Sequence, residues 1–396
     1  MKKPVFLKLE RDRKYLIGAR GIVDVRTGQV EENVCLAVEG GRIRWMGPAD
    51  SELEFYLPYY LTPGFVDCHV HLGLGLDGEK DGLRVVERGE RVPVEVRKRL
   101  KTCLHHGVVL IRDGGDKYGV ALRARTAVAD RMVEGPETVS TGFALCKMGG
   151  YGSFLGRPVS GVKEIEDALE QLADLKVGQV KVIISGIVSF RNFGEVGKIQ
   201  FTSEELEFLV EAARVRGLKV MAHASGREAV MLAVRAGVHS VEHGYFVEED
   251  TLEEMAERGT AWVPTVIPVF AALQRADESS GTVVKNVVEK TYRKQLETIR
   301  RAAALGVKMG IGTDAGAVGV GHGEAFRREM ALYHEAGLTP RQIWEMATLG
   351  GAEVVGAEQD YGTLTPGKVA AFLGFRENPI WKPPHLLQPD LVAYPV

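Results

Sequence analysis

The chain of 396 residues has few cysteines, little net charge and no long apolar run. Its 4 cysteines are scattered without a CxxC pair, which is typical of reduced thiols in a cytoplasmic protein. The 50 basic against 53 acidic residues leave a charge of −3, which argues against sequence-independent nucleic-acid binding. No apolar segment reaches the roughly 20 residues of a membrane-spanning helix, so we expect no membrane partner.

What the chain does have is a repeated alternation of short apolar runs and amphipathic helical patterns. The expected strands are 64–72, 108–113, 138–143, 179–185, 218–224, 238–243, 261–265 and 307–314. Alternating strands and helices of this kind predict parallel strands joined by right-handed crossovers. Eight of them predict an α/β fold of the (β/α)8 TIM barrel type. An open doubly wound sheet is disfavoured, because no glycine-rich dinucleotide turn follows the first strand.

The two ends of the chain have a different character from its middle. Residues 1–60 contain short alternating β-type runs, with a hairpin expected at Glu39-Gly40-Gly41. Residues 362–396 show the same character, in GTLTPGKVAAFLGF. We therefore expect both ends to pair into one small β-sandwich domain beside a barrel formed by residues 61–361.

Two histidines stand two residues apart in TPGFVDCHVHL. On a strand, His69 and His71 point to the same face, which in a barrel is the interior. Two imidazoles side by side in a core suit a divalent metal ion better than they suit packing. The alternative at this point is a buried, hydrogen-bonded histidine pair.

Four further titratable residues stand near the carboxyl ends of later strands, where barrel enzymes place catalysis. They are Lys181, His223, His243 and Asp314. Taken singly, His223 is better explained as a core histidine, and Asp314 is equally well explained as a helix cap. Their recurrence at the same end of strands 1, 4, 5, 6 and 8 favours a shared site.

Lys181 lies on an expected strand, between the apolar residues Val180 and Val182. An ammonium buried beside metal-binding histidines would be repelled by the cations and costly to desolvate. A neutral lysine can react with CO2 to give a carbamate, an anion able to bridge two metal ions. An ion pair between Lys181 and Asp314 is the alternative.

These residues resemble the amidohydrolase superfamily. The resemblance rests on PGFVDCHVH, Lys181, the strand-5 and strand-6 histidines and GTDAG, and it extends over nearly the whole chain. Within the superfamily the chain is most similar to the imidazolonepropionase-like and Xaa-Pro dipeptidase-like group. This closer likeness rests on GVVLIRDGG, on VEHGYFVEEDTLEEMAERGTAWVPT and on the segment that begins GTDAGAVGVGHGE.

The resemblance implies a binuclear centre of two divalent ions, expected to be zinc. His69, His71 and Asp314 would hold one ion, and His223 and His243 the other. Lys181, as a carbamate, would bridge them. The implied reaction is attack by metal-bound hydroxide on an amide-type C–N bond, with Asp314 as general base and then general acid.

Two positions depart from the dipeptidase pattern. Ser225 stands where those enzymes carry a tyrosine after the strand-5 histidine, and Tyr151 stands where they tend to carry a histidine in a glycine-rich stretch. Tyr151 is therefore a candidate for polarising the carbonyl or touching the substrate. Both departures leave the metal ligands intact, but they put prolidase specificity in doubt.

Other reactions are possible on the same centre. A deaminase is disfavoured, because Gly226 stands where the mononuclear deaminases tend to place a glutamate and because they lack the bridging lysine. A lactonase or a phosphotriesterase would use the same ligands and remains an alternative. A metal-free structural paralogue would be expected to have lost ligands, whereas the full set is present here.

Substrate choice is expected in the long loops that follow the strands. These are 73–92, 145–161, 186–202 and 266–288. Arg191 or Arg227 could bind a substrate carboxylate, and His322 could reach the substrate. The expected substrate is a small molecule, a dipeptide-like compound or an N-acyl amino acid, and the expected assembly is a homo-oligomer.

Overall fold

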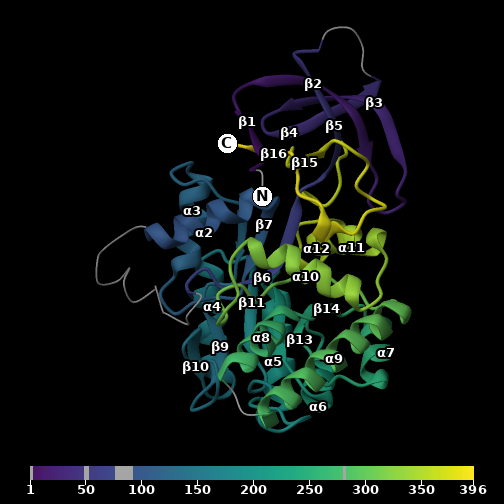
Figure 1. The fold of residues 1–396 in the computed structure, drawn as a ribbon. Helices are drawn as coiled ribbons and strands as arrows, with labels where there is room; N and C mark the ends of the chain where they lie inside the picture. The colour runs from purple at the N-terminus through teal and green to yellow at the C-terminus, as the bar shows by residue number, and fades with distance from the viewer. Residues whose placement is uncertain (1–2, 49–52, 76–91, 280–281) are drawn as a thin grey trace.

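The computed structural model describes residues 3–48, 53–75, 92–279 and 282–396. Through the middle of the chain short strands alternate with helices, and strands from both ends meet on one side of the molecule (Figure 1). Among the described helices, none combines the length and the apolar character that a membrane crossing requires.

The two chain ends share one mixed sheet of seven strands, in the order β1–β16–β15–β5–β2–β3–β4. Its strands are β1 (Val5–Leu9), β2 (Lys14–Val23), β3 (Val30–Glu39), β4 (Arg42–Pro48), β5 (Phe55–Pro63), β15 (Phe372–Phe375) and β16 (Leu391–Pro395). The predicted hairpin joins β3 to β4, with Gly40 and Gly41 at positive φ where other residues are strained. Strands from the two ends of the chain thus pair in a single sheet.

The middle of the chain contributes two parallel sheets, in the orders β6–β7–β8 and β10–β9–β11–β12–β13–β14. Their strands are β6 (Phe65–Val70), β7 (Val108–Asp113), β8 (Glu137–Ser140), β9 (Ala144–Lys147), β10 (Gly156–Val159), β11 (Gln179–Ile183), β12 (Lys219–Ala224), β13 (Ser240–His243) and β14 (Ala261–Val263). Seven of these match predicted strands. The short strands β9 and β10 lie in the segment expected to be the loop 145–161.

The eighth expected strand, 307–314, is bonded to a neighbour on each side. Trp262 of β14 donates its backbone N–H to Lys308 O at 2.8 Å. On the other side, Cys68 of β6 donates to Ile311 O at 2.8 Å, and Asp314 N donates to His69 O at 2.7 Å. This segment therefore lies between β14 and β6 and brings Asp314 beside the two histidines of β6.

The helices occupy the connections between strands. They are α2 (Val94–His105), α3 (Val120–Ala129), α4 (Gly161–Asp174), α5 (Ser203–Val215), α6 (Arg227–Ala236), α7 (Glu249–Arg258), α8 (Ile267–Ser279), α9 (Thr282–Ala304), α10 (Glu324–Glu335), α11 (Pro340–Ala347) and α12 (Leu349–Val355). Helix α5 shows how the sequence defines its ends: Thr202 and Glu205 form a capping box, and Gly217 follows with a positive φ. Its apolar positions Leu206 and Leu209 are fully buried.

The expected loop 266–288 is wrong, because most of it is helical in α8 and the start of α9. The cap of α8 comes from a distant part of the chain. The buried carboxylate of Glu329, in α10, accepts the backbone N–H groups of Val266 at 2.7 Å and Ile267 at 2.8 Å. Because this contact joins residues far apart in the sequence, no local pattern predicts it. Most of the expected loop 73–92 lies outside the described residues.

Candidate metal centre

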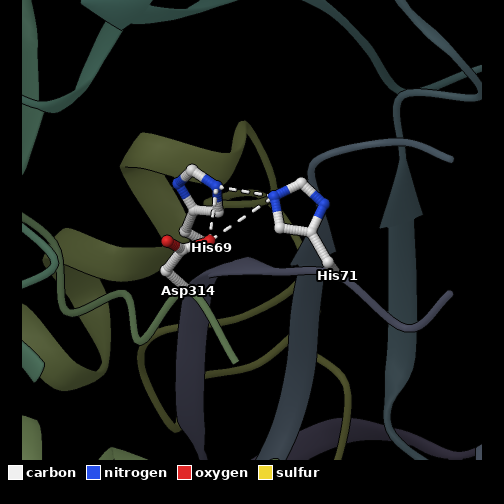
Figure 2. Close-up of side chains that lie close together, drawn as sticks. All are labelled: His69, His71 and Asp314. Carbon is white, nitrogen blue, oxygen red and sulfur yellow. Dashed lines mark hydrogen bonds and ion pairs between the residues drawn. The ribbon is translucent and has the colours of Figure 1, made fainter. Parts of the chain in front are cut away.

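Three side chains converge at the end of β6 and of the segment that precedes Ala315. Nε2 of His69 lies 3.3 Å from Nε2 of His71, and these two atoms lie 3.6 and 3.5 Å from Oδ1 of Asp314. Figure 2 shows the two rings and the carboxylate pointing toward one another. One ligand atom from each residue lies within 4.8 Å of the others, which is a geometry that can hold a metal ion.

The backbone explains why these residues meet. Strand alternation places His69 and His71 on one face of β6. The hydrogen bond from Asp314 N to His69 O, and a second from His71 N to Ala315 O at 2.7 Å, fix the aspartate beside them. Nothing in the sequence around Asp314 predicts an unusual backbone. Its φ is nevertheless +53°, in the left-handed region that non-glycine residues rarely adopt.

Two more histidines and the lysine stand on the neighbouring strands β11, β12 and β13. The strand register pairs Ile183 with His223 and Ala224 with His243. The ring centroids of His223 and His243 are 4.5 Å apart, and that of His243 is 5.1 Å from that of His69. The six predicted ligand residues thus form one continuous group.

This group forms the polar end of a cavity of about 560 Å³. Of the six, all except His69 line it, and His69 is fully buried behind His71. Much of the remaining wall is apolar: Leu74, Phe154, Leu155, Val188, Phe190 and Val269. A cavity with apolar walls and a few convergent polar groups is the usual form of a small-molecule site.

Three of the four histidines, His69, His71 and His243, direct one ring nitrogen toward a fixed partner. Nδ1 of His69 lies 2.8 Å from Glu242 Oε2, Nδ1 of His243 lies 2.7 Å from Thr265 Oγ1, and Nδ1 of His71 lies 3.3 Å from Gly115 O. Nε2 of His223 has no hydrogen-bond partner. Such outward hydrogen bonds set the tautomer and leave Nε2 free to bind a metal ion.

The electrostatics of the site also suit a cation. Burial lowers the pKa of His71 and His223 to about 3, and it holds the pKa of His69 and His243 well below the usual range. The imidazoles are therefore neutral, which is the form that binds metals. Burial likewise lowers the pKa of Lys181, whose Nζ has no hydrogen-bond partner. A buried amine and a buried imidazole nitrogen without partners are groups that a bound ion would satisfy.

Backbone strain is concentrated at the same place. His243 has a φ of +68° and Thr265 a φ of +45°, in addition to Asp314. These residues follow or end neighbouring strands and all touch the centre or hold one of its histidines. Strain of this kind persists where the surrounding structure over-determines it, and it clusters at functional sites.

The predicted substrate contacts divide into two groups. Tyr151 lines the cavity, with its ring centroid 5.7 Å from that of His223. Arg191, Arg227 and His322 are not among the lining residues. The guanidinium of Arg227 is bonded to Asp250, and Nε2 of His322 lies 3.2 Å from the backbone oxygen of His71.

Several residues near the site were not singled out from the sequence. Glu242 and Arg112, both fully buried, form an ion pair at 2.8 Å beneath His69. Glu242 directly precedes His243, so a charged residue inside an apolar strand was the available signal. Arg275 lines the cavity from α8, in the segment expected to be a loop.

Comparison with known proteins agrees with this geometry. A model of the amidohydrolase family matches residues 60–392. The chain is 26% identical over 427 residues to an ochratoxinase of Aspergillus niger, covering 96% of this chain and 85% of that protein. It is 25% identical over 388 residues to an imidazolonepropionase of Pseudomonas fluorescens, covering 87% and 88%. The crystal structure of a Xaa-Pro dipeptidase with bound methionine in the active site matches with a TM-score of 0.82 at 25% identity, over 96% of this chain and 98% of that one.

The chain therefore belongs to the amidohydrolase family, and the resemblance predicted from its motifs is confirmed. It is an enzyme, a hydrolase that acts on carbon–nitrogen bonds of small molecules.

Proposed function

We propose that this enzyme is a binuclear metal-dependent amidohydrolase that cleaves an amide bond in a dipeptide-like or N-acyl amino acid substrate. The observation that carries the proposal is the convergence of four neutral imidazoles, a buried unpartnered amine and a carboxylate at one end of a single cavity. His69, His71 and Asp314 form the first ion site, and His223 and His243 the second. Lys181 lines the same cavity, and we propose that it bridges the two sites.

Lys181 is suited to become the bridging ligand. Its amine lies in the low-dielectric floor of the cavity, where burial favours the neutral form. The neutral Nζ forms a bond to the carbon of CO2 and releases one proton, which gives a carbamate anion. This anion carries two oxygen ligands on the carbon bonded to Nζ, the atom that otherwise has no hydrogen-bond partner.

Divalent ions at these sites, with zinc the ion we propose, would lower the pKa of water and polarise the scissile carbonyl. Asp314 accepts a proton from the attacking water and donates it to the leaving nitrogen. Its Oδ1 lies within 3.6 Å of Nε2 of both His69 and His71, so the carboxylate is placed beside the proposed site of the attacking water. The strained backbone at Asp314 fixes its side chain for both transfers.

Tyr151 is the proposed hydrogen-bond donor to the substrate carbonyl. Its ring lies beside His223 on the cavity wall, and burial raises the pKa of its hydroxyl to about 12. The hydroxyl therefore keeps its proton at neutral pH and can donate it to oxygen. This role would compensate for Ser225, which is too short to reach as a tyrosine would.

The amide specificity is supported by relatives. Ochratoxinase and imidazolonepropionase are both related over most of the chain, and the similar Xaa-Pro dipeptidase holds methionine, a free amino acid, in its active site. A free amino acid is one product of cleaving a dipeptide or an N-acyl amino acid.

We also propose that the parallel strands close into a (β/α)8 barrel of residues 61–361. The bonds of segment 307–314 to β14 and β6 support closure on one side, and a hydrogen bond from Gly178 N to Ser140 O at 2.9 Å links the two parallel sheets on the other. Residues 1–60 and 362–396, which share the seven-stranded sheet, form the second domain, for which we propose the β-sandwich architecture.

Metal analysis and a substrate panel test this function together. The purified protein should contain two divalent ions per chain, and the zinc-loaded enzyme should cleave dipeptides or N-acyl amino acids. The same panel includes lactones and phosphotriesters. Turnover of those esters without amide cleavage would overturn the substrate assignment, and a protein that binds no metal would overturn the mechanism.

A further inference from the structure

Within the described part of the cavity wall, the lysine and arginine side chains are Lys181 and Arg275. They stand in different surroundings. Lys181 is fully buried beside the histidines, whereas Arg275 is exposed and donates from Nη1 to the backbone oxygen of Val318 at 2.7 Å. The cavity thus has a buried group of proposed metal ligands and, in addition, one exposed arginine side chain in its wall.

Arg275 lies beside the exposed part of the wall. Two apolar lining residues, Ile187 and Val318, are 54% and 49% exposed, and Val318 is the residue to which Arg275 is bonded. The apolar lining residues therefore extend from the histidines to the solvent. A ligand that fills this space therefore meets both apolar side chains and a guanidinium.

The guanidinium is held in place but is not neutralised. Among the described residues, no carboxylate forms an ion pair with Arg275, and its one hydrogen bond goes to a neutral carbonyl. Gly319, with a φ of +82°, permits this position, because a Cβ atom there would collide with Nη1. Since guanidinium has five N–H donors in a fixed fork, donors remain for a bidentate carboxylate.

The other arginines considered for this role are less suitable. Arg227 is bonded to Asp250 and lies 3.5 Å from Glu248, so its charge is already matched. Arg191 is exposed and does not line the cavity. Arg275 alone combines a place on the wall with an unmatched charge among the described arginines.

We propose that Arg275 binds the carboxylate of the substrate, so that the enzyme selects N-acyl amino acids or dipeptides with an apolar side chain and a free carboxylate. This proposal rests on the proposed amidohydrolase function and names the residue that determines its specificity. The guanidinium contributes equally to the ground state and the transition state, because it lies apart from the reacting atoms. Its loss should therefore raise KM and leave kcat nearly unchanged.

The test compares two compounds that share one scissile amide, N-acetyl-L-phenylalanine and N-acetylphenethylamine, which lacks the carboxylate. The wild-type enzyme should favour the acid. Arg275→Gln should raise KM for the acid about 10-fold to 100-fold, as expected for a lost charged hydrogen bond, with kcat within about 3-fold. N-acetylphenethylamine should be cleaved equally well by the wild type and by Arg275→Gln. Arg275→Lys should be intermediate, since an ammonium lacks the planar fork.

Arg191→Gln is the matched control, because it removes an exposed arginine from the neighbouring loop. It should leave both KM values unchanged. Equal KM values for the acid in wild type and Arg275→Gln would overturn the assignment while leaving the amidohydrolase function intact.

Calorimetric titration with L-phenylalanine separates the two proposals. Binding to the wild-type protein and its loss in Arg275→Gln would support the anchor even if no amide were cleaved, in which case the proposed reaction alone would fail. Absence of phenylalanine binding to the wild-type protein would overturn the anchor.

Discussion

At the residue scale, the orientation of His69 depends on a buried ion pair whose residues are not proposed metal ligands. Glu242 accepts a hydrogen bond from Nδ1 of His69 and pairs with Arg112, which also donates from Nε to Cys68 O at 2.7 Å. The network ties the histidine to β6, β7 and β13 at once. Its members are all fully buried, so each depends on the others for a partner.

We expect Glu242→Gln to weaken metal binding about 10-fold to 100-fold, because it removes the charged acceptor that orients His69 and leaves Arg112 without its anion. Competition against a metal chelator measures the change. Glu248→Gln is the control, since Glu248 is 67% exposed and pairs only with Arg227. Unchanged metal affinity in a folded Glu242→Gln protein would contradict a positioning role.

Replacing Lys181 should remove one of the two proposed metal ions. Without Nζ no carbamate can form, so Lys181→Ala should retain about one metal ion per chain and lose at least about 100-fold in kcat. Metal content by elemental analysis and turnover of a cleaved substrate provide the two readings. Lys219→Ala, at the opposite end of the adjacent strand β12, should change neither. Two ions bound per chain in Lys181→Ala would refute the bridge.

The convergence of the proposed ligand residues could be predicted, because strand position brings them together. His69 and His71 share a face by alternation, and the ends of successive parallel strands meet at one edge. The partners of those ligands could not be predicted in the same way. The contacts of His69 with Glu242 and of His243 with Thr265 join different strands through side-chain rotamers, which no periodic pattern encodes.

At the scale of elements, most strands were predictable and α8 was not. Strands such as β7 and β11 are short apolar runs whose burial is complete, so composition marks them. Helix α8 begins at Ile267, and the N–H groups of Val266 and Ile267 are satisfied by Glu329 from α10. A cap supplied across 60 residues of sequence leaves no local signal. The consequence reaches the site, because Arg275 lies on this helix.

The cap by Glu329 makes stability depend on pH. Burial raises the pKa of this carboxyl to about 8, whereas its pKa in the unfolded chain is about 4.3. The folded state therefore binds the proton more tightly, and this contribution to stability is complete below about pH 4.3 and is lost as the pH rises to about 8. Glu329→Gln cannot ionise, so its unfolding free energy should fall less than that of the wild type between pH 5 and 8.

Denaturant unfolding at several pH values measures this difference. Glu324→Gln, at the exposed start of the same helix, should follow the wild type. Parallel curves for wild type and Glu329→Gln would show that Glu329 does not titrate in this range.

At the scale of the whole molecule, one tryptophan contacts both the seven-stranded sheet and the strand that carries two of the proposed metal ligands. The ring of Trp344, in α11, lies 5.2 Å from that of Phe65 at the start of β6 and 5.5 Å from that of Phe375 at the end of β15. Its Nε1 donates to Pro379 O at 3.2 Å, and the side chain is fully buried. The helix thus joins the sheet built from both chain ends to the strand of His69 (Figure 1).

Trp344→Ala should therefore cost about 3–5 kcal/mol of unfolding free energy, since it leaves a large cavity and an unpaired carbonyl. Because Phe65 lies four residues before His69, the loss of its support should also weaken metal binding. Thermal unfolding with and without metal measures both effects, and Trp381→Ala, which removes a 66% exposed ring, should change stability by less than about 0.5 kcal/mol. If Trp344→Ala lowered stability but left metal affinity unchanged, the contact would stabilise the fold without supporting the metal site, and the second part of the prediction would be wrong.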